Sequence, residues 1–305
     1  MSGVRHDPQI ALSELRTVRD WLRWTVSEMN RHDVQLGQGC FSVWDDAVFL
    51  VLRSLKLPVD QLEPFLDASV LPHERELLSQ RVGQRCLDRI PTSYLVGEAW
   101  LQGYRFLVTP EVLIPRSPIS ELVCAGLEPW ITAGEQMNRI ADICTGSGCL
   151  AILAALQFPN ARVDATDISE AALQVAEANV RDYGLSTTVH LHRGNLLEPL
   201  PANVRYDLII SNPPYVNSAS MSCLPAEFEH EPSLALAGGT DGMDLVRQIL
   251  EQARTRLTAQ GHLLLEIGHE ADHFEAAFPE IEPLWLDTQA TSRQIMLLSA
   301  EQLGQ

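Results

Sequence analysis

From Pro115 onward, short apolar segments alternate with segments of helical periodicity. This alternation is typical of a mostly parallel sheet with helices on both faces. Since only a short loop separates the last two apolar segments, the final strand is predicted to be antiparallel. The sequence therefore predicts an α/β fold with a seven-stranded sheet. Strands are expected near residues 139–144, 161–167, 187–192, 206–211, 261–267, 284–287 and 293–299, and helices near 117–128, 148–157, 169–183, 243–259 and 270–277.

The chain before this alternation is different in character. Apolar residues recur at helical spacing between residues 10 and 87, and Pro58 and Pro72 interrupt the pattern. Two aromatic-rich runs then flank Gln102-Gly103, which favours a β-hairpin. The predicted organisation is a small helical domain over residues 1–91, a β-hairpin linker over 92–114 and a larger domain over 115–305.

Composition limits the class of protein and of partner. The hydrophobic content of 46% and the lack of an apolar run of membrane-spanning length favour a folded, soluble protein. The first residues do not have the apolar core of a signal peptide, and the six cysteines are scattered, so we expect a cytoplasmic protein with reduced thiols. A net charge of −18 disfavours non-specific binding of phosphate backbones and favours a basic partner or a small substrate.

The segment Asn212-Pro213-Pro214-Tyr215 directly follows the apolar run 206–211. Ligands of open α/β sheets bind beyond the carboxyl ends of the strands, so this segment is expected at the site. The Asn212 side chain and the Pro213 carbonyl offer acceptors, and Tyr215 offers a flat face. Together they can hold a planar NH2 group. The alternative is an ordinary turn, because proline and asparagine both favour turns.

A glycine loop follows the first predicted strand of the sheet. Residues 142–149 read Asp-Ile-Cys-Thr-Gly-Ser-Gly-Cys, and the glycines let a ligand approach the backbone closely. The third glycine of the dinucleotide fingerprint is absent, which favours a nucleoside without a pyrophosphate. Asp167 ends the second strand and can bind ribose hydroxyls, while Asn195 follows the third strand and can bind an adenine amino group. The alternatives are a plain strand-to-helix turn and helix-capping roles for Asp167 and Asn195.

In their order along the chain, these motifs resemble the class I S-adenosylmethionine-dependent methyltransferases with a Rossmann-like sheet, and within them the glutamine methyltransferases of the HemK/PrmC-like superfamily. The resemblance covers nearly the whole chain. It includes Ile114-Pro115-Arg116, Glu231-Pro232 and the Gly-Gly-Thr-Asp-Gly segment at 238–242. Asn195 departs from the pattern, since aspartate is common there.

Two branches of this superfamily differ after Pro115-Arg116. The release-factor branch continues Pro-x-Thr-Glu, whereas this chain reads Ser117-Pro118-Ile119-Ser120-Glu121-Leu122, which is similar to the PrmB-type branch that methylates a glutamine of the third large-subunit ribosomal protein. The resemblance implies S-adenosyl-L-methionine as cofactor, a basic ribosomal protein as substrate, and transfer without a metal. It implies catalytic roles for Asn212, Pro213, Pro214 and Tyr215, and cofactor binding by Asp142, Thr145, Gly146, Gly148, Asp167, Asn195 and Asn212.

Other functions remain open at this point. DNA amino-methyltransferases share the clamp motif, but they need a basic groove for the DNA backbone, so DNA is not expected as a substrate. A release factor is the nearer alternative substrate, and a ribosome-assembly factor with a vestigial cofactor pocket is a non-catalytic one. Residues 269–273 read His-Glu-Ala-Asp-His, which matches a zinc-protease motif. No motif for a third ligand follows, so these histidines are interpreted as residues on a solvated helix.

Overall fold

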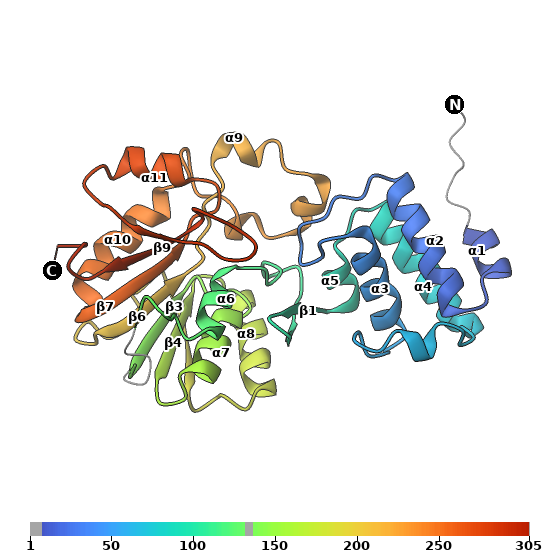
Figure 1. Cartoon of the computed structure of the whole chain (residues 1–305), viewed down its shortest axis with the longest axis horizontal. Helices are drawn as coiled ribbons and strands as arrows, with labels where there is room; N and C mark the ends of the chain where they lie inside the picture. The colour runs from blue at the N-terminus through green and yellow to red at the C-terminus, as the bar shows by residue number, and fades with distance from the viewer. Residues whose placement is uncertain (1–7, 132–136, 305) are drawn as a thin grey trace. The chain divides into compact units, whose positions relative to one another are not determined.

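The computed structural model describes residues 8–131 and 137–304. It divides into two compact units (Figure 1). The helical unit contains the chain up to Ala99 together with the segment Pro225–His230. The sheet unit contains Trp100–Leu224 and Glu231–Gln305. A short segment from the second half of the chain is therefore part of the helical unit, which the domain boundaries drawn from the sequence do not include.

Amphipathic helices build the helical unit around two small apolar clusters. Thr17 begins the second helix with a capping box, in which its side chain accepts from the Asp20 N–H and the Asp20 carboxylate accepts from the Thr17 N–H. Trp21, Leu50 and Leu78 are fully buried at the centre. The helices are α1 (Pro8–Glu14), α2 (Val18–Arg31), α3 (Val43–Ser54), α4 (Pro72–Cys86) and α5 (Thr92–Val96), with a 3-10 helix η1 (Glu63–Phe65) between α3 and α4.

The predicted hairpin linker begins with a helix instead of a strand. Thr92–Val96 forms α5, and Gly97 ends this helix in the left-handed region with φ 78°. Strand β1 (Glu98–Leu101) and strand β2 (Tyr104–Leu107) follow. Positive φ at both Gln102 and Gly103 suits the tight turn that joins them. The aromatic and β-branched residues at 94–96 favour a strand locally, but Pro91 and Gly97 delimit a short helix that packs on α3 and α4.

The sheet unit confirms the predicted α/β fold. Its seven strands lie in the order β5-β4-β3-β6-β7-β9-β8, and β9 is antiparallel to both of its neighbours. The order reverses direction at β3, where β4 lies on one side and β6 on the other. Ligands of such sheets bind at this switch point. The strands are β3 (Arg139–Ile143), β4 (Arg162–Asp167), β5 (Val189–Arg193), β6 (Tyr206–Ser211), β7 (Leu257–Glu266), β8 (Leu284–Leu286) and β9 (Ile295–Ser299).

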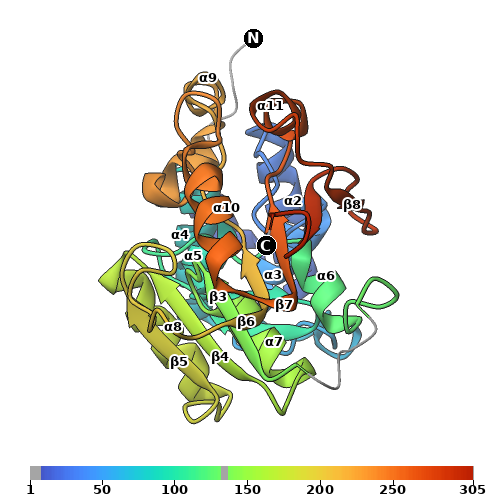
Figure 2. The same ribbon diagram turned by 90° about the vertical axis from the view of Figure 1, so that its left-hand side faces the viewer.

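Helices cover both faces of this sheet (Figure 2). One apolar cluster joins the sheet to α6 (Ile119–Cys124), α7 (Cys149–Gln157) and α8 (Glu170–Asp182). A second cluster joins the opposite face to α10 (Asp244–Arg256) and α11 (Ala271–Ala277). The central strand β6 is apolar and buried at successive positions because helices cover both faces. Three short elements lie between β6 and α10, namely α9 (Ser218–Met221), η3 (Ala226–His230) and η4 (Ser233–Ala235). Among the described residues, no helix is both long and apolar enough to cross a membrane.

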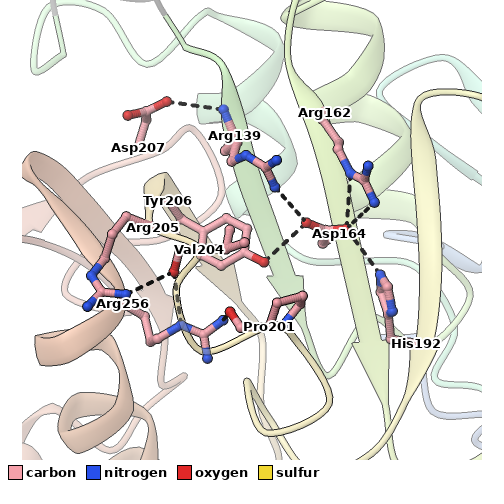
Figure 3. Close-up of polar contacts among 10 residues, drawn as sticks. All are labelled: Arg139, Arg162, Asp164, His192, Pro201, Val204, Arg205, Tyr206, Asp207 and Arg256. Atoms are coloured by element: carbon pink, nitrogen blue, oxygen red, sulfur yellow. Dashed lines mark hydrogen bonds and ion pairs between the residues drawn. The ribbon is translucent and has the colours of Figure 1, made fainter.

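One polar network interrupts the apolar faces of the sheet (Figure 3). Asp164 in β4 is 3% exposed, and its carboxylate accepts a hydrogen bond from the Tyr206 hydroxyl at 3.1 Å. His192 Nε2 lies 3.1 Å from the same carboxylate, Arg162 lies at 3.4 Å and Arg139 at 3.7 Å. Two arginines and a histidine from three neighbouring strands therefore surround this buried carboxylate.

Candidate functional site

A cavity of about 400 Å³ opens at the carboxyl ends of the central strands. Residues that directly follow β3, β4, β5 and β6 line it, as expected for a sheet of this order. The segment before α6 and the segment around η4 complete the wall. The lining residues are 111–117, 144–147, Cys149, Leu150, 167–169, Ala172, 194–196, Asn212, Pro214, 232–235 and Leu245.

The glycine loop forms one wall of this cavity. Thr145 and Gly146 line it, and a Cβ atom at Gly146 would have nothing within 4 Å, so the backbone here is open to a ligand. Gly146 itself has φ 55°, a conformation that favours glycine. Gly148, with φ 79°, does not line the cavity; its missing side chain lets α7 approach α8, since a Cβ would lie 3.2 Å from Ala176 Cβ.

Asp142 supports the glycine loop from the side away from the cavity. Its carboxylate is 1% exposed, does not line the cavity, and accepts from the Thr145 hydroxyl at 2.5 Å and the Ala151 N–H at 3.0 Å. Burial raises the pKa of this carboxyl to about 7, despite these two hydrogen bonds. Asp142 thus fixes the loop to the start of α7. A direct role in holding a cofactor stays a prediction.

Asp167 and Asn195 both line the cavity. The Asp167 carboxylate accepts from the N–H groups of Gly146 and Ser169, each at 2.9 Å, and burial raises its pKa. The two N–H groups fix the carboxylate at the wall of the cavity. Asn195 uses its amide nitrogen, which donates to Glu198 at 2.9 Å. A contact between its side-chain oxygen and an adenine amino group stays a prediction.

The Asn-Pro-Pro-Tyr segment leaves β6 at the adjacent wall. Asn212 and Pro214 line the cavity, whereas Pro213 and Tyr215 do not. The preceding Ser211 is fully buried and donates to the Ile143 carbonyl at 2.9 Å, which ties the end of β6 to the end of β3. The structure therefore brings the Asn212 amide to the same cavity as the glycine loop and Asp167.

Three glycines surround Tyr215 from distant parts of the sequence. A Cβ at Gly238 would lie 2.6 Å from Tyr215 Cα, and one at Gly242 would lie 2.3 Å from the Tyr215 carbonyl oxygen. A Cβ at Gly268 would lie 2.3 Å from the ring atom Cε2 of Tyr215. Because a side chain at any of these three positions would displace Tyr215, Gly238 and Gly242 fix where its backbone lies, and Gly268 fixes where its ring lies.

A buried carboxylate holds the other end of the ring. Glu266, the last residue of β7, is 4% exposed and accepts from the Tyr215 hydroxyl at 3.1 Å and from the Ser117 hydroxyl. Burial raises the pKa of Glu266 to about 7, outweighing both hydrogen bonds and the charge of Arg116. Burial and the charge of Glu266 in turn raise the pKa of Tyr215 well above its usual value. The tyrosine hydroxyl therefore stays protonated and donates.

The two motifs at 114–116 and 231–232 meet in the structure. Arg116 donates to both carboxylate oxygens of Glu231, at 2.5 and 2.8 Å, and the Ile114 N–H also donates to Glu231 at 3.1 Å. The Glu231 side chain is fully buried. Bidentate pairs of this kind fix geometry as well as charge. The pair thus joins the segment before α6 to the segment at η4, both of which line the cavity.

The His-Glu-Ala-Asp-His segment has other partners. Glu270 accepts from Asn217 Nδ2 at 2.8 Å and is paired with His273 Nδ1. His269 Nδ1 instead lies 3.0 Å from Gln294 Nε2. Among the residues that the structure describes, no group of three or more histidine, cysteine or acidic side chains is arranged to hold a metal ion. Glu270 holds the loop that follows Tyr215.

Reasoning from the sequence missed several residues of the site. Ile168, Leu234 and Leu245 line the cavity with apolar surface, and Glu266 and Ser117 support Tyr215. One signal for Glu266 is present in the sequence, since a single carboxylate ends the apolar run before Gly268. The partner of that carboxylate lies 51 residues earlier, and only the neighbouring positions of β6 and β7 bring the two together.

Known proteins resemble this chain along nearly its whole length. The model of the Methyltransferase small domain family matches residues 127–227. A protein of Bordetella pertussis (strain Tohama I) named ribosomal protein uL3 glutamine methyltransferase is 58% identical over 95% of this chain and 97% of its own length. A protein of the same name from Burkholderia pseudomallei (strain K96243) is 48% identical over 94% and 96% of the two chains.

The fold also recurs in solved structures. The crystal structure of the hMettl16 catalytic domain in complex with MAT2A 3'UTR hairpin 6 aligns with a TM-score of 0.50 and 17% identity, over 77% of this chain and 85% of that one. At this identity the likeness concerns the fold alone.

Proposed function

Because the chain belongs to the family of ribosomal protein uL3 glutamine methyltransferases, we propose that it methylates the side-chain amide nitrogen of a glutamine in uL3, the third protein of the large ribosomal subunit. The proposed methyl donor is S-adenosyl-L-methionine. The observation that carries this proposal is the position of Asn212, on the wall of the cavity and at the carboxyl end of β6.

The chain's own residues meet the demands of an amide substrate. An amide nitrogen is a poor nucleophile, because its lone pair is delocalised into the carbonyl group. Asn212 lines the cavity, and its side-chain oxygen is one acceptor for the N–H bonds of the amide. Pro213 and Tyr215 lie beside it in the chain and outside the cavity lining, and their proposed roles are a second acceptor and a flat face for the amide plane. Fixing a reactant in this way can contribute several kcal/mol, about 7–11 in the most favourable cases. Once methylated, the nitrogen is strongly acidic and releases its extra proton to water.

The cavity also fits the donor. Its volume of about 400 Å³ lies in the range of small-molecule sites, which is roughly 300–1,000 Å³. The open backbone at Gly146, the carboxylate of Asp167 and the apolar side chains of Ile168 and Leu196 suit a nucleoside, and Asn195 suits its base. When bound, S-adenosyl-L-methionine supplies an electrophilic methyl group on a sulfonium cation. Thr145, Gly146, Asp167, Asn195 and Asn212 are the residues proposed to hold it.

Charge supports a basic protein as the partner. The chain has a net charge of −18. Proteins that bind ribosomal RNA carry positive charge to neutralise its phosphates, so uL3 and this enzyme attract each other before contact. Such steering weakens as salt screens the charges.

The test uses methyl-labelled S-adenosyl-L-methionine and three purified acceptors assayed separately: uL3, a class I release factor and unmethylated duplex DNA. Label on uL3, mapped to a glutamine by fragmentation, is the expected result. Label on the release factor would move the chain to the sister activity, and label on DNA would assign the clamp to an exocyclic base amine. Label on none of the three, with cofactor binding intact, would count against the proposed reaction.

A second measurement tests the cofactor residues. Asp167→Ala is expected to weaken binding of S-adenosyl-L-methionine by about 1–3 kcal/mol, the usual effect of losing charged hydrogen bonds. Isothermal calorimetry gives this value directly. Glu170→Ala, an exposed carboxylate in the first turn of α8, is the control. Equal affinities of Asp167→Ala and the wild type would remove Asp167 from the site.

A further inference from the structure

We propose that Glu266 is a positioning residue for the methyl transfer, which acts by holding the hydroxyl end of Tyr215 and thereby the plane in which the substrate amide lies. This inference rests on the proposed function and extends it to a residue beyond the Asn-Pro-Pro-Tyr segment. Glu266 does not line the cavity. Its influence on the reaction passes through the tyrosine.

Glycines confine the backbone and ring edge of Tyr215, and Glu266 holds its hydroxyl group. Gly238 and Gly242 confine its backbone, and Gly268 confines one edge of its ring. These contacts are steric, and they do not hold the hydroxyl group. The hydrogen bond of 3.1 Å from the hydroxyl to Glu266 fixes that end of the ring. Residues from two separate segments, 238–242 and 266–268, thus locate one aromatic ring.

The carboxylate of Glu266 is held in turn by its neighbours. Ser117, which is 4% exposed, donates its hydroxyl to Glu266. Arg116, the neighbouring cation, is paired with Glu231 instead. Glu266 is therefore held by two hydroxyl groups, while a bidentate arginine pair beside it holds the cavity wall. Because Ser117 lies in the segment that lines the cavity, Glu266 also connects this segment to Tyr215.

Stability alone gives no reason for a carboxylate at this position. A buried carboxylate whose hydrogen bonds come from hydroxyl groups is unfavourable, and a neutral amide of the same shape could bind the same hydroxyls. Burial raises the pKa of Glu266 to about 7. The charged form is the better acceptor, because hydrogen bonds to ionised acceptors are about twice as strong as neutral ones. An unfavourable charge next to a site is a common sign of function.

The pH dependence of the reaction reports on this group. Tyr215, Ser117 and Arg116 face the carboxylate, and Glu231 lies beyond Arg116. If the ionised form positions the ring, wild-type kcat rises with pH through about 7. Loss of the Ser117 hydrogen bond raises the pKa of Glu266 further, so Ser117→Ala is expected to move this rise to higher pH. Glu266→Gln is expected to abolish it.

The experiment compares kcat, KM for uL3 and the Kd of S-adenosyl-L-methionine for four variants: Glu266→Gln, Ser117→Ala, Tyr215→Phe, and the double variant with Tyr215→Phe and Glu266→Gln. We expect Glu266→Gln to lower kcat about tenfold at pH 8, since small displacements in a site have effects of this size or more. The Kd is expected to stay within about twofold. The double variant is expected to be no slower than the slower single variant, because both changes break the same contact.

Asp164→Asn is the matched control, because Asp164 is a second buried carboxylate that accepts from a tyrosine hydroxyl at 3.1 Å. Its kcat and pH profile are expected to match those of the wild type below its melting temperature. Two results would overturn the proposal: wild-type kcat and pH profile in Glu266→Gln, or losses that multiply in the double variant. If Glu266→Gln fails to fold, Ser117→Ala provides the test. A pH dependence of kcat equal to that of the wild type in Ser117→Ala would then overturn the proposal. Inactive wild-type protein would instead count against the proposed function.

Discussion

The sheet unit contains two buried carboxylates that each accept a hydrogen bond from a tyrosine at 3.1 Å, and their surroundings differ in charge. Around Asp164, the guanidinium groups of Arg139 and Arg162 and the ring of His192 lie within 3.7 Å (Figure 3). Around Glu266, the partners are the hydroxyls of Tyr215 and Ser117. The first carboxylate has cations within ion-pair distance, whereas the second accepts from two neutral hydroxyls and feels the charge of Arg116, which is paired with Glu231.

This difference suggests different roles: Asp164 contributes to the stability of the fold, and Glu266 positions a residue of the proposed active site. A buried charge surrounded by cations is costly to disturb, and its loss leaves several groups without a partner. A buried charge held by hydroxyls is unfavourable for the folded state, so a use in the site is the better explanation for it. Changes near Asp164 should therefore alter stability with little effect on turnover, and changes near Tyr215 should lower turnover.

Asn212→Ala is expected to show the largest effect on turnover. If Asn212 holds the reacting amide as proposed, its removal should lower kcat by roughly 10²–10³-fold, as for other preorganised polar groups in active sites. The melting temperature and the Kd of S-adenosyl-L-methionine should change little. Kinetic assays with uL3, scanning calorimetry and cofactor titration measure the three quantities. Turnover equal to that of the wild type would show that the clamp does not act on the substrate.

Gly268→Ala is expected to lower kcat by about 10²-fold, because a Cβ there would lie 2.3 Å from the Tyr215 ring and displacements of about 1 Å can have this effect. Gly184→Ala is the matched control. Gly184 also has positive φ, 68° against 54° for Gly268, but nothing lies within 4 Å of its Cβ position. Backbone strain should lower the stability of both variants, whereas only Gly268→Ala should lose turnover. Similar turnover in the two would mean that ring position is unimportant.

Asp164→Asn is expected to lower the free energy of unfolding by about 2–3 kcal/mol. A fully buried pair would lose about 3–5 kcal/mol, and the partial exposure of Arg139 and Arg162 reduces this figure. Urea unfolding followed by circular dichroism measures the change. A drop in kcat at a temperature where the variant is folded would contradict the division between the two regions.

Glu266 is also expected to affect how stability depends on pH. Its pKa is raised from 4.5 to about 7 in the folded protein, so the folded state binds the proton more tightly than the unfolded state. Stability should therefore fall as pH rises from about 4.5 to about 7, by at most about 1.4 kcal/mol per pH unit for one group.

Asp142 contributes with the same sign, since its pKa is also raised to about 7. Glu266→Gln should remove part of the fall and leave the part due to Asp142. Urea unfolding of both proteins at intervals between pH 4.5 and 8 measures the two slopes. Identical slopes would show that Glu266 is not the titrating group.

The alternation of apolar and helical segments was sufficient to predict the sheet, including its antiparallel last strand. Periodicity is a local property, and buried parallel strands show it strongly. Local preference was wrong at residues 94–96, where tertiary packing and flanking Pro91 and Gly97 produce a helix. The predicted helix near residues 117–128 is also shorter in the structure, at Ile119–Cys124.

The site was predictable where its residues directly follow strands. Thr145, Gly146, Asp167, Asn195 and Asn212 all line one cavity, because the carboxyl ends of parallel strands meet at one edge. Supporting contacts were not predictable in this way. Glu266 meets Tyr215, and Arg116 meets Glu231, only through the order of the strands and the course of the loops.

The segment Pro225–His230 has a consequence for the order of events during synthesis. Glu227 is 1% exposed within the helical unit, where it accepts from the Gln35 N–H at 2.9 Å and from Arg89 at 3.3 Å, and lies 3.8 Å from Arg85. The ribosome makes these partners more than a hundred residues before Glu227. The contacts of Arg85 and Arg89 with Glu227 can therefore form only after strands β3 to β6 have been translated. Until then, the helical unit lacks this carboxylate.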